Sequence, residues 1–249
     1  MRKWIRRIWV TAGITSMGWL FWNAQARGVD PALLRSTAAV AVSDSGSIVR
    51  FTPATPAGSG LIFLPGATIE PKAYAPLLRA VAEAGYPVAL VRLPWRMAPS
   101  AASRAVVWNR IATVQTMDPT RRWILAGHSR GAALSAGFAG EHPDALAGLV
   151  LIATTHPRTV DLSALPIPVT KIYGTRDCVA DSEEVLANAG KLPRATHWVR
   201  LEGANHRQFG WYGSQLGDCS ATMTRDAQQA RTLDALLAAL AAATGAPSS

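Results

Sequence analysis

Short apolar segments alternate with longer amphipathic segments along most of the chain. The short segments have four to six residues, are mainly apolar and are rich in Val, Ile and Leu, as is typical of strands buried on both faces of a sheet. We predict strands at Ala38–Val42, Ser47–Thr52, Gly60–Leu64, Val88–Leu93, Trp123–Ala126, Leu149–Ile152, Val169–Tyr173 and His197–Leu201.

The segments between these strands have the spacing of helices that lie on a sheet. We predict helices at Tyr74–Glu83, Arg104–Thr116, Ala132–Ala139, Ser182–Gly190 and Asp226–Ala243. The last of them places four leucines on one face, at positions 233, 236, 237 and 240. Alternation of strand and helix predicts an α/β fold with a mainly parallel sheet of about eight strands, covered by helices on both faces. The turn at Asp44-Ser45-Gly46 predicts an antiparallel hairpin at one edge.

The first 26 residues have the composition of a targeting segment. Basic residues of MRKWIRR precede an uncharged stretch from Ile8 to Trp22, and Ala24-Gln25-Ala26 has the pattern of a signal-peptidase site. The fifteen residues of this stretch would form a helix about 22 Å long, which is shorter than the hydrocarbon core of a bilayer, about 30 Å thick. We therefore expect residues 1–26 to be a cleaved signal peptide, with a retained membrane anchor as the alternative, and residues 36–245 to form a single domain in the periplasm or outside the cell.

The net charge of the chain outside this segment does not indicate a polyanionic partner. The formal net charge is +9, but four of the 25 basic residues lie in the first 26 residues, which contain no acid, so that 21 basic and 16 acidic residues remain. Those basic residues are scattered rather than gathered into a stripe with interleaved aromatic residues. We expect no nucleic-acid partner, and membrane contact only through the N-terminal segment.

The most informative motif is Gly127-His128-Ser129-Arg130-Gly131, which lies between a predicted strand and a predicted helix. A nucleophile elbow needs this composition, because small residues on both sides of the serine let strand and helix approach closely while the sharp turn exposes the hydroxyl. The motif alone is weak evidence. Its position between strand and helix makes Ser129 a strong candidate for a catalytic nucleophile.

A serine nucleophile requires a general base and a carboxylate that orients the base. Asp177 follows the strand VTKIYG and His206 follows the strand HWVRLEG, so both lie at the carboxyl edge where the elbow lies. His156 also follows a strand and is the competing candidate for the base. For the developing oxyanion we expect two backbone donors, the N–H of Arg130 and the N–H of Ala67 in the loop Pro65-Gly66-Ala67-Thr68.

From about Leu61 to the C-terminal helix, the sequence resembles the alpha/beta-hydrolases, in particular a small exported or membrane-anchored group related to the dienelactone hydrolases. The resemblance is carried by LPGATIEPKAYAPL, GHSRG, YGTRD and NHRQFGWYGSQLGD. It implies the fold, hydrolysis of esters or related acyl compounds, no cofactor, and a triad of Ser129, Asp177 and His206. Dienelactone hydrolases use cysteine as the nucleophile, so the serine here leaves the substrate undefined.

Two further features concern the shape and stability of the site. Only about sixteen residues, 153–168, join two strands where larger relatives insert a lid, so we expect an open site suited to a small or exposed ester. Cys178 adjoins Asp177, and Cys219 follows the His206 loop, so a disulfide would tie both loops together. The aromatic residues Phe209, Trp211 and Tyr212 either line the substrate pocket or pack the loop against the core.

These features favour a serine hydrolase of the carboxylesterase type that acts on a small acyl substrate. The same triad also suits an acyltransferase or a peptidase, and the fold could serve a non-catalytic exported binding protein. We expect no cofactor, because no Gly-x-Gly-x-x-Gly motif follows an early strand, and no metal, because the histidines and cysteines are scattered.

Overall fold

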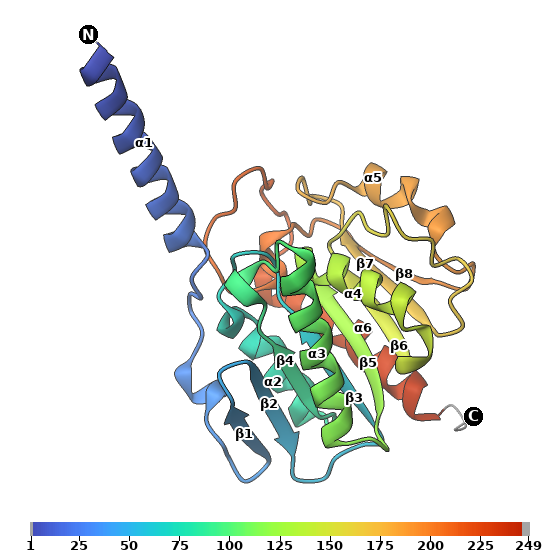
Figure 1. The fold of residues 1–249 in the computed structure, drawn as a ribbon. Coiled ribbons are helices and arrows are strands. Elements are labelled where there is room, and N and C mark those ends of the chain that lie inside the picture. Colours follow the sequence, from blue (N-terminus) through green and yellow to red (C-terminus); the bar gives the residue numbers. More distant parts are fainter. Residues whose placement is uncertain (1, 246–249) are drawn as a thin grey trace.

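One eight-stranded sheet organises the chain in a computed structural model that describes residues 2–245 (Figure 1). Its strand order is β1-β2-β4-β3-β5-β6-β7-β8. The strands are β1 (Val40–Asp44), β2 (Ile48–Pro53), β3 (Ser59–Leu64), β4 (Val88–Val91), β5 (Arg122–His128), β6 (Gly148–Ile152), β7 (Val169–Gly174) and β8 (His197–Leu201).

The pairing confirms the predicted sheet. Strand β2 pairs antiparallel with β1 and with β4, which gives the expected hairpin at one edge. The pairs from β4 through β3, β5, β6 and β7 to β8 are parallel. Parallel strands end at the same edge of a sheet, so the loops after β3, β5, β7 and β8 lie together there.

Helices cover both faces of the sheet, as predicted (Figure 1). They are α2 (Ala75–Glu83), α3 (Ala101–Met117), α4 (Arg130–Glu141), α5 (Ser182–Ala187) and α6 (Arg225–Gly245). Leu78 of α2 and Leu236 of α6 belong to one apolar cluster, whereas Ile111 of α3 and Ala136 of α4 belong to the other. The core is therefore divided by the sheet into two layers of apolar packing.

Two elements differ from the prediction in ways that have a physical reason. Helix α5 ends at Ala187 instead of Gly190, and a short 3-10 turn, Ala189–Lys191, follows it. Strand β8 is not buried on both faces, because it is the edge strand and leaves His197 and Arg200 exposed. His197 and Arg200 point to opposite faces of β8, so solvent reaches both faces of the sheet at this edge.

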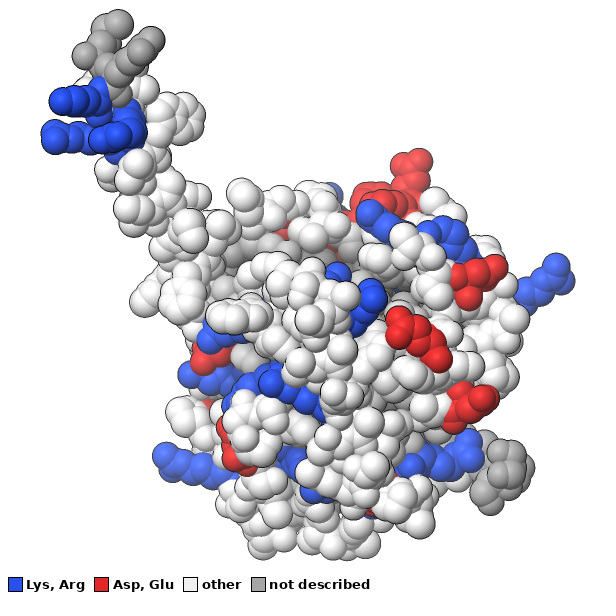
Figure 2. All heavy atoms as spheres, in the orientation of Figure 1, with Lys and Arg blue, Asp and Glu red and all other residues white. Residues whose placement is uncertain are grey.

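The N-terminal helix α1 (Arg2–Asn23) projects away from the body of the molecule (Figure 1). Its distal end carries basic side chains, among them Lys3, Arg6 and Arg7 (Figure 2). Within residues 2–245, the structure contains no helix that is both long enough and apolar enough to cross a membrane. Contacts with the body begin at the end of α1, before residue 36 where we expected the domain to start, and include the buried Ala24.

The elbow depends on a close approach of β5, α4 and β3. A Cβ atom on Gly127 would lie 2.3 Å from the carbonyl carbon of Gly131, and a Cβ atom on Gly131 would lie 2.0 Å from the carbonyl oxygen of Leu64. These neighbours are backbone atoms, which cannot move aside as a flexible side chain can. The two glycines therefore allow the turn that carries Ser129 to pack against the end of β3.

We predict that Gly131→Ala lowers the free energy of unfolding by about 3 kcal/mol or more, because the added methyl group overlaps backbone atoms. Urea unfolding followed by circular dichroism measures this. The matched control is Gly190→Ala, where no atom lies within 4 Å of the added Cβ atom and where the change should be within about 0.5 kcal/mol of zero. Equal stability of the two variants would contradict the packing described here.

Candidate active site

Ser129 occupies the turn between β5 and α4 in a strained backbone conformation. Its φ is 53° and its ψ is −114°, a combination that non-glycine residues rarely adopt. The Ser129 N–H donates to the carbonyl of Ile152 at 2.9 Å, which fixes the turn against β6. The side chain is half-buried and stands at the N-terminus of α4, where free backbone N–H groups favour negative charge.

His206 and Asp177 form a buried pair beside this turn. The two residues follow β8 and β7, and His206 Nδ1 lies 2.8 Å from Asp177 Oδ2. The other carboxylate oxygen of Asp177 accepts hydrogen bonds from the N–H groups of Val179 and Ala180, at 2.9 and 2.7 Å. Both side chains of the pair are almost fully buried, so the carboxylate holds the imidazole in one orientation.

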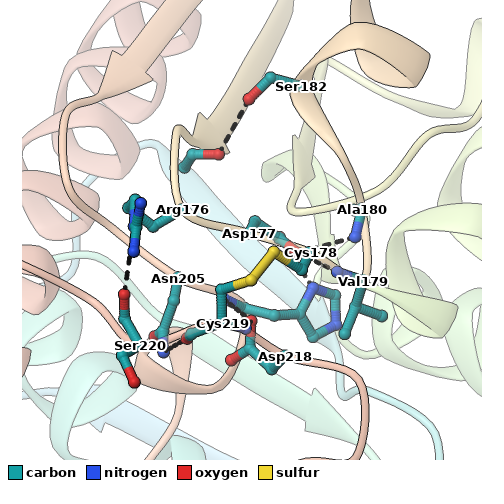
Figure 3. The surroundings of a disulfide bond; sticks show 12 residues. Arg176, Asp177, Cys178, Val179, Ala180, Ser182, Asn205, Asp218, Cys219 and Ser220 are labelled. Carbon is teal, nitrogen blue, oxygen red and sulfur yellow. Dashed lines mark hydrogen bonds and ion pairs between the residues drawn. A yellow bond between two sulfur atoms is a disulfide. The ribbon is translucent and has the colours of Figure 1, made fainter.

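The loop that carries His206 is clamped by Asp218 and by a disulfide (Figure 3). Asp218 Oδ1 accepts from the N–H of His206 at 3.2 Å, and Asp218 Oδ2 accepts from the N–H of Arg207 at 3.0 Å. The structure contains the predicted Cys178–Cys219 disulfide, which joins the residue after Asp177 to the residue after Asp218. Closing a loop of this length stabilises a fold by about 4 kcal/mol in the chain-entropy model. The bond also indicates an oxidising environment.

Ser129 and His206 line one cavity of about 260 Å³. The structure records no hydrogen bond between these two side chains, and His206 Nε2 is buried without a partner among the described residues. A serine side chain has three staggered positions about χ1, and its hydroxyl hydrogen turns freely. Catalytic hydrogen bonds are often long before substrate binds, so the arrangement is compatible with a contact that forms on binding.

The two expected oxyanion donors lie at the same edge. The N–H of Arg130 is at the first position of α4, where no helical partner exists. Ala67 lies in the loop after β3, and its N–H donates no hydrogen bond to any acceptor in the described part of the chain. The strained residue of this loop is Thr68, with φ at 65°, and not Gly66 as the Pro-Gly sequence suggests.

His128 connects the elbow to the oxyanion loop. Gly66 N–H donates to the Tyr74 hydroxyl at 3.0 Å, and that hydroxyl lies 2.8 Å from His128 Nδ1. Burial lowers the pKa of His128 well below its ordinary value, so the ring is neutral and forms this hydrogen bond without carrying a charge. A Cβ atom on Gly66 would lie 3.0 Å from both ring nitrogen and hydroxyl, which is why a glycine fits here.

Other residues singled out in the sequence take different positions. His156 lines the same cavity as Ser129, but no carboxylate among the described residues pairs with its ring. The Arg130 guanidinium donates to the carbonyls of Met97 and Ala98, at 3.0 and 2.7 Å, and so faces neighbouring backbone. Phe209 and Tyr212 are buried in the core, which favours the packing interpretation for these two aromatic residues.

Sequence reasoning missed the supporting residues Tyr74 and Asp218. Tyr74 lies directly before α2 and Asp218 lies in a loop. Both fall within segments that carry the family resemblance, but nothing in those segments assigns either residue a role. Their roles depend on contacts with residues far along the chain, which a single sequence does not display. Within residues 2–245, no three His, Cys, Asp or Glu side chains are grouped as ligands for a metal ion.

Lys171 of β7 is a buried charged group that sequence reasoning also missed. Its side chain is 1% exposed, and its ammonium group donates to the carbonyl of His156, while no described carboxylate pairs with it. Burial lowers the pKa of Lys171 from 10.5 to about 7. The unfolded chain therefore binds more protons than the folded chain above about pH 7, and stability rises with pH up to about 10.5.

We predict that the free energy of unfolding of the wild type rises by about 2 kcal/mol from pH 7 to pH 9 relative to Lys171→Met. The methionine variant keeps the apolar stem but has no proton to release. Urea unfolding of both proteins at pH 6, 7, 8 and 9 measures the difference. Parallel stability curves for the two proteins would contradict a lysine that is neutral in the folded state.

Similarity to known proteins agrees with this fold. The family model described as "Alpha/beta hydrolase family" matches residues 60–230. No curated protein matches the chain significantly. Similar solved structures include a predicted CIB-like hydrolase from Thermoplasma acidophilum, with a TM-score of 0.60 and 15% identity over 79% of this chain and 98% of that chain. They also include a monoacylglycerol lipase from Paleococcus ferrophilus, with a TM-score of 0.59 and 13% identity over 77% of this chain and 98% of that chain.

Est1E from Butyrivibrio proteoclasticus is a third example, with a TM-score of 0.59 and 12% identity over 82% of this chain and 100% of that chain. Identities this low show a shared fold and leave substrates open. The match to the family model spans most of the chain, from β3 to the beginning of α6. The eight-stranded sheet has the fold of this family, and the chain belongs to the alpha/beta hydrolase family.

Proposed function

We propose that the protein is a serine hydrolase that cleaves carboxylic esters through Ser129, His206 and Asp177. The observation that carries this proposal is the buried His206–Asp177 hydrogen bond at 2.8 Å beside a cavity that also contains Ser129. The backbone strain at Ser129 supports it, because strained serines at strand-to-helix turns present their hydroxyl to a substrate. The monoacylglycerol lipase named above shares the fold.

The chemistry follows from this arrangement. His206 Nε2 takes the proton of the Ser129 hydroxyl while Oγ forms a bond to the acyl carbon, and Asp177 stabilises the imidazolium. When the ester bond breaks, the same proton passes to the leaving alcohol. Water then releases the acyl group as a carboxylic acid by the reverse sequence of proton transfers. The backbone N–H groups of Arg130 and Ala67 donate to the oxyanion in both halves of the reaction.

His206 is a better base than His156 in this scheme. The Nδ1 atom of His206 is held by a carboxylate, which leaves Nε2 directed to its other side as the acceptor of a proton. His156 lacks such a partner, and burial together with the charge of Arg158 lowers its pKa. An imidazolium at position 156 would therefore be disfavoured at the moment when a base must become charged.

We predict that a fluorophosphonate probe labels the purified wild-type protein and that Ser129→Ala abolishes the labelling, because the probe bonds to an activated serine oxygen. Gel fluorescence and peptide mass spectrometry measure the modification. Ser163→Ala, which removes an exposed hydroxyl, should label as the wild type does.

Variants of the two candidate bases should differ in their rate of ester hydrolysis. We expect His206→Ala to lower kcat by about 10³-fold or more, and His156→Ala by less than about tenfold, because only the first removes the base. A short-chain acyl ester with a coloured leaving group is a suitable substrate. A wild-type protein that neither labels nor hydrolyses any ester of an acyl panel would favour a binding protein on this fold.

A further inference from the structure

The end of α1 is bound into the carboxyl edge of the sheet by hydrogen bonds to two loops. These bonds run from Gly213 N to Asn23 O (2.8 Å), Ser214 N to Asn23 Oδ1 (2.9 Å), Glu70 N to Ala24 O (2.8 Å), Ala26 N to Glu70 Oε2 (2.8 Å) and Arg27 N to Trp211 O (2.8 Å). One of the loops continues from the oxyanion loop after β3, and the other continues from the His206 turn. The segment therefore supports both loops of the candidate active site.

The body is shaped to receive this segment. A Cβ atom on Gly213 would lie 2.5 Å from Asn23 Oδ1 and 3.1 Å from Asn23 Cα, so glycine at this position makes room for Asn23. Ala24 is 6% exposed and belongs to the larger apolar cluster of the core. Cleavage after Ala26, at the signal-peptidase pattern, would remove both residues and leave their contacts empty. The predicted cleavage site therefore closely follows residues that are buried against the body.

An apolar groove of about 550 Å³ lies between α1 and the body. Leu20 and Phe21 of α1 line one side, and Ala67 and Thr68 of the oxyanion loop line another. Leu216 lies on the rim and is 75% exposed. A groove with this lining suits an unbranched hydrocarbon chain better than a polar group.

The groove and the Ser129 cavity are neighbours across one short loop. Trp95 and Arg96 line the groove, whereas the carbonyls of Met97 and Ala98 accept hydrogen bonds from Arg130, which lines the cavity. Ala67, whose N–H is the expected second oxyanion donor, is itself part of the groove wall. An acyl chain in the groove would thus have its carbonyl end near the reacting groups.

The surface around the groove fits a lipid bilayer. Helix α1 exposes apolar side chains along its length, with tryptophans at positions 4 and 9 near one end and 19 and 22 near the other. Basic side chains gather at its distal end (Figure 2), and at its base the Arg96 guanidinium stacks on Phe21 at 5.9 Å. Aromatic and cationic side chains of this kind bind at the boundary between acyl chains and anionic headgroups.

We propose that α1 remains in the mature protein, inserts into a bilayer, and forms with the oxyanion loop a groove that binds the acyl chain of a membrane lipid ester. This proposal rests on the proposed hydrolase function and names its substrate class. It revises the expectation of a small or exposed ester, because the chain-binding surface comes from the N-terminal helix and needs no lid.

The test compares two probes with the same reactive group and different chains. Ethyl and hexadecyl fluorophosphonate react with the full-length protein in the same detergent, and the second-order rate constant of Ser129 modification is measured for each. We expect the hexadecyl probe to react at least about tenfold faster, because each buried methylene group contributes to binding. The double variant Leu20→Gln/Leu216→Gln, which places amides in the groove at exposed positions, should reduce this ratio by about tenfold.

The matched control is Val10→Gln/Ile14→Gln, which makes α1 equally more polar away from the groove and should keep the wild-type ratio. A wild-type ratio near one, or an equal loss in both double variants, would overturn the groove while leaving the hydrolase function intact. Absence of reaction with both probes would instead overturn the hydrolase function. Intact mass of the protein from the producing cells tests retention of α1, and a mature chain that begins at Arg27 would overturn it.

Discussion

The hydrogen bond between Asp177 and His206 joins loops that leave two neighbouring parallel strands, β7 and β8. This hydrogen bond forms only if both loops keep their positions, and the neighbouring side chains and backbone groups hold them there. Asp177 is fixed by two backbone N–H groups, and the His206 turn is fixed by the carboxylate of Asp218. The disulfide then ties the two loops covalently next to the pair (Figure 3). These contacts hold both loops in place and so keep His206 within hydrogen-bond distance of Asp177.

Sequence patterns predicted the sheet well because parallel strands buried on both faces have a composition that few other elements share. The elbow and the strands before Asp177 and His206 could be predicted for the same reason. The disulfide between Cys178 and Cys219 could be predicted because one cysteine adjoins Asp177 and the other follows the His206 loop. Tyr74, Asp218 and Lys171 were not, since their functions come from contacts across the fold. Ala24 and Ala26 fit a signal-peptidase pattern and also the small residues of a packed turn, so the start of the domain at residue 36 stays a prediction.

The N-terminal segment gives the site a second level of support. It contacts the loop after β3 through Glu70 and the loop after His206 through Gly213, so changes at the end of α1 would reach both of these loops of the candidate active site. A helix that exposes apolar residues to solvent is costly unless lipid or protein covers them. The proposed insertion of α1 into a bilayer would remove this cost and would place the carboxyl edge of the sheet at the membrane surface.

A crystal structure of the protein after reaction with an alkyl fluorophosphonate tests the central claim most directly. The account predicts a covalent bond from Ser129 Oγ to phosphorus, with the phosphoryl oxygen about 3 Å from the backbone nitrogens of Arg130 and Ala67. It also predicts that His206 keeps its bond to Asp177 and directs Nε2 towards Ser129 Oγ or the alkoxy oxygen. Phosphorus on another side chain, or a phosphoryl oxygen directed away from both nitrogens, would contradict the account.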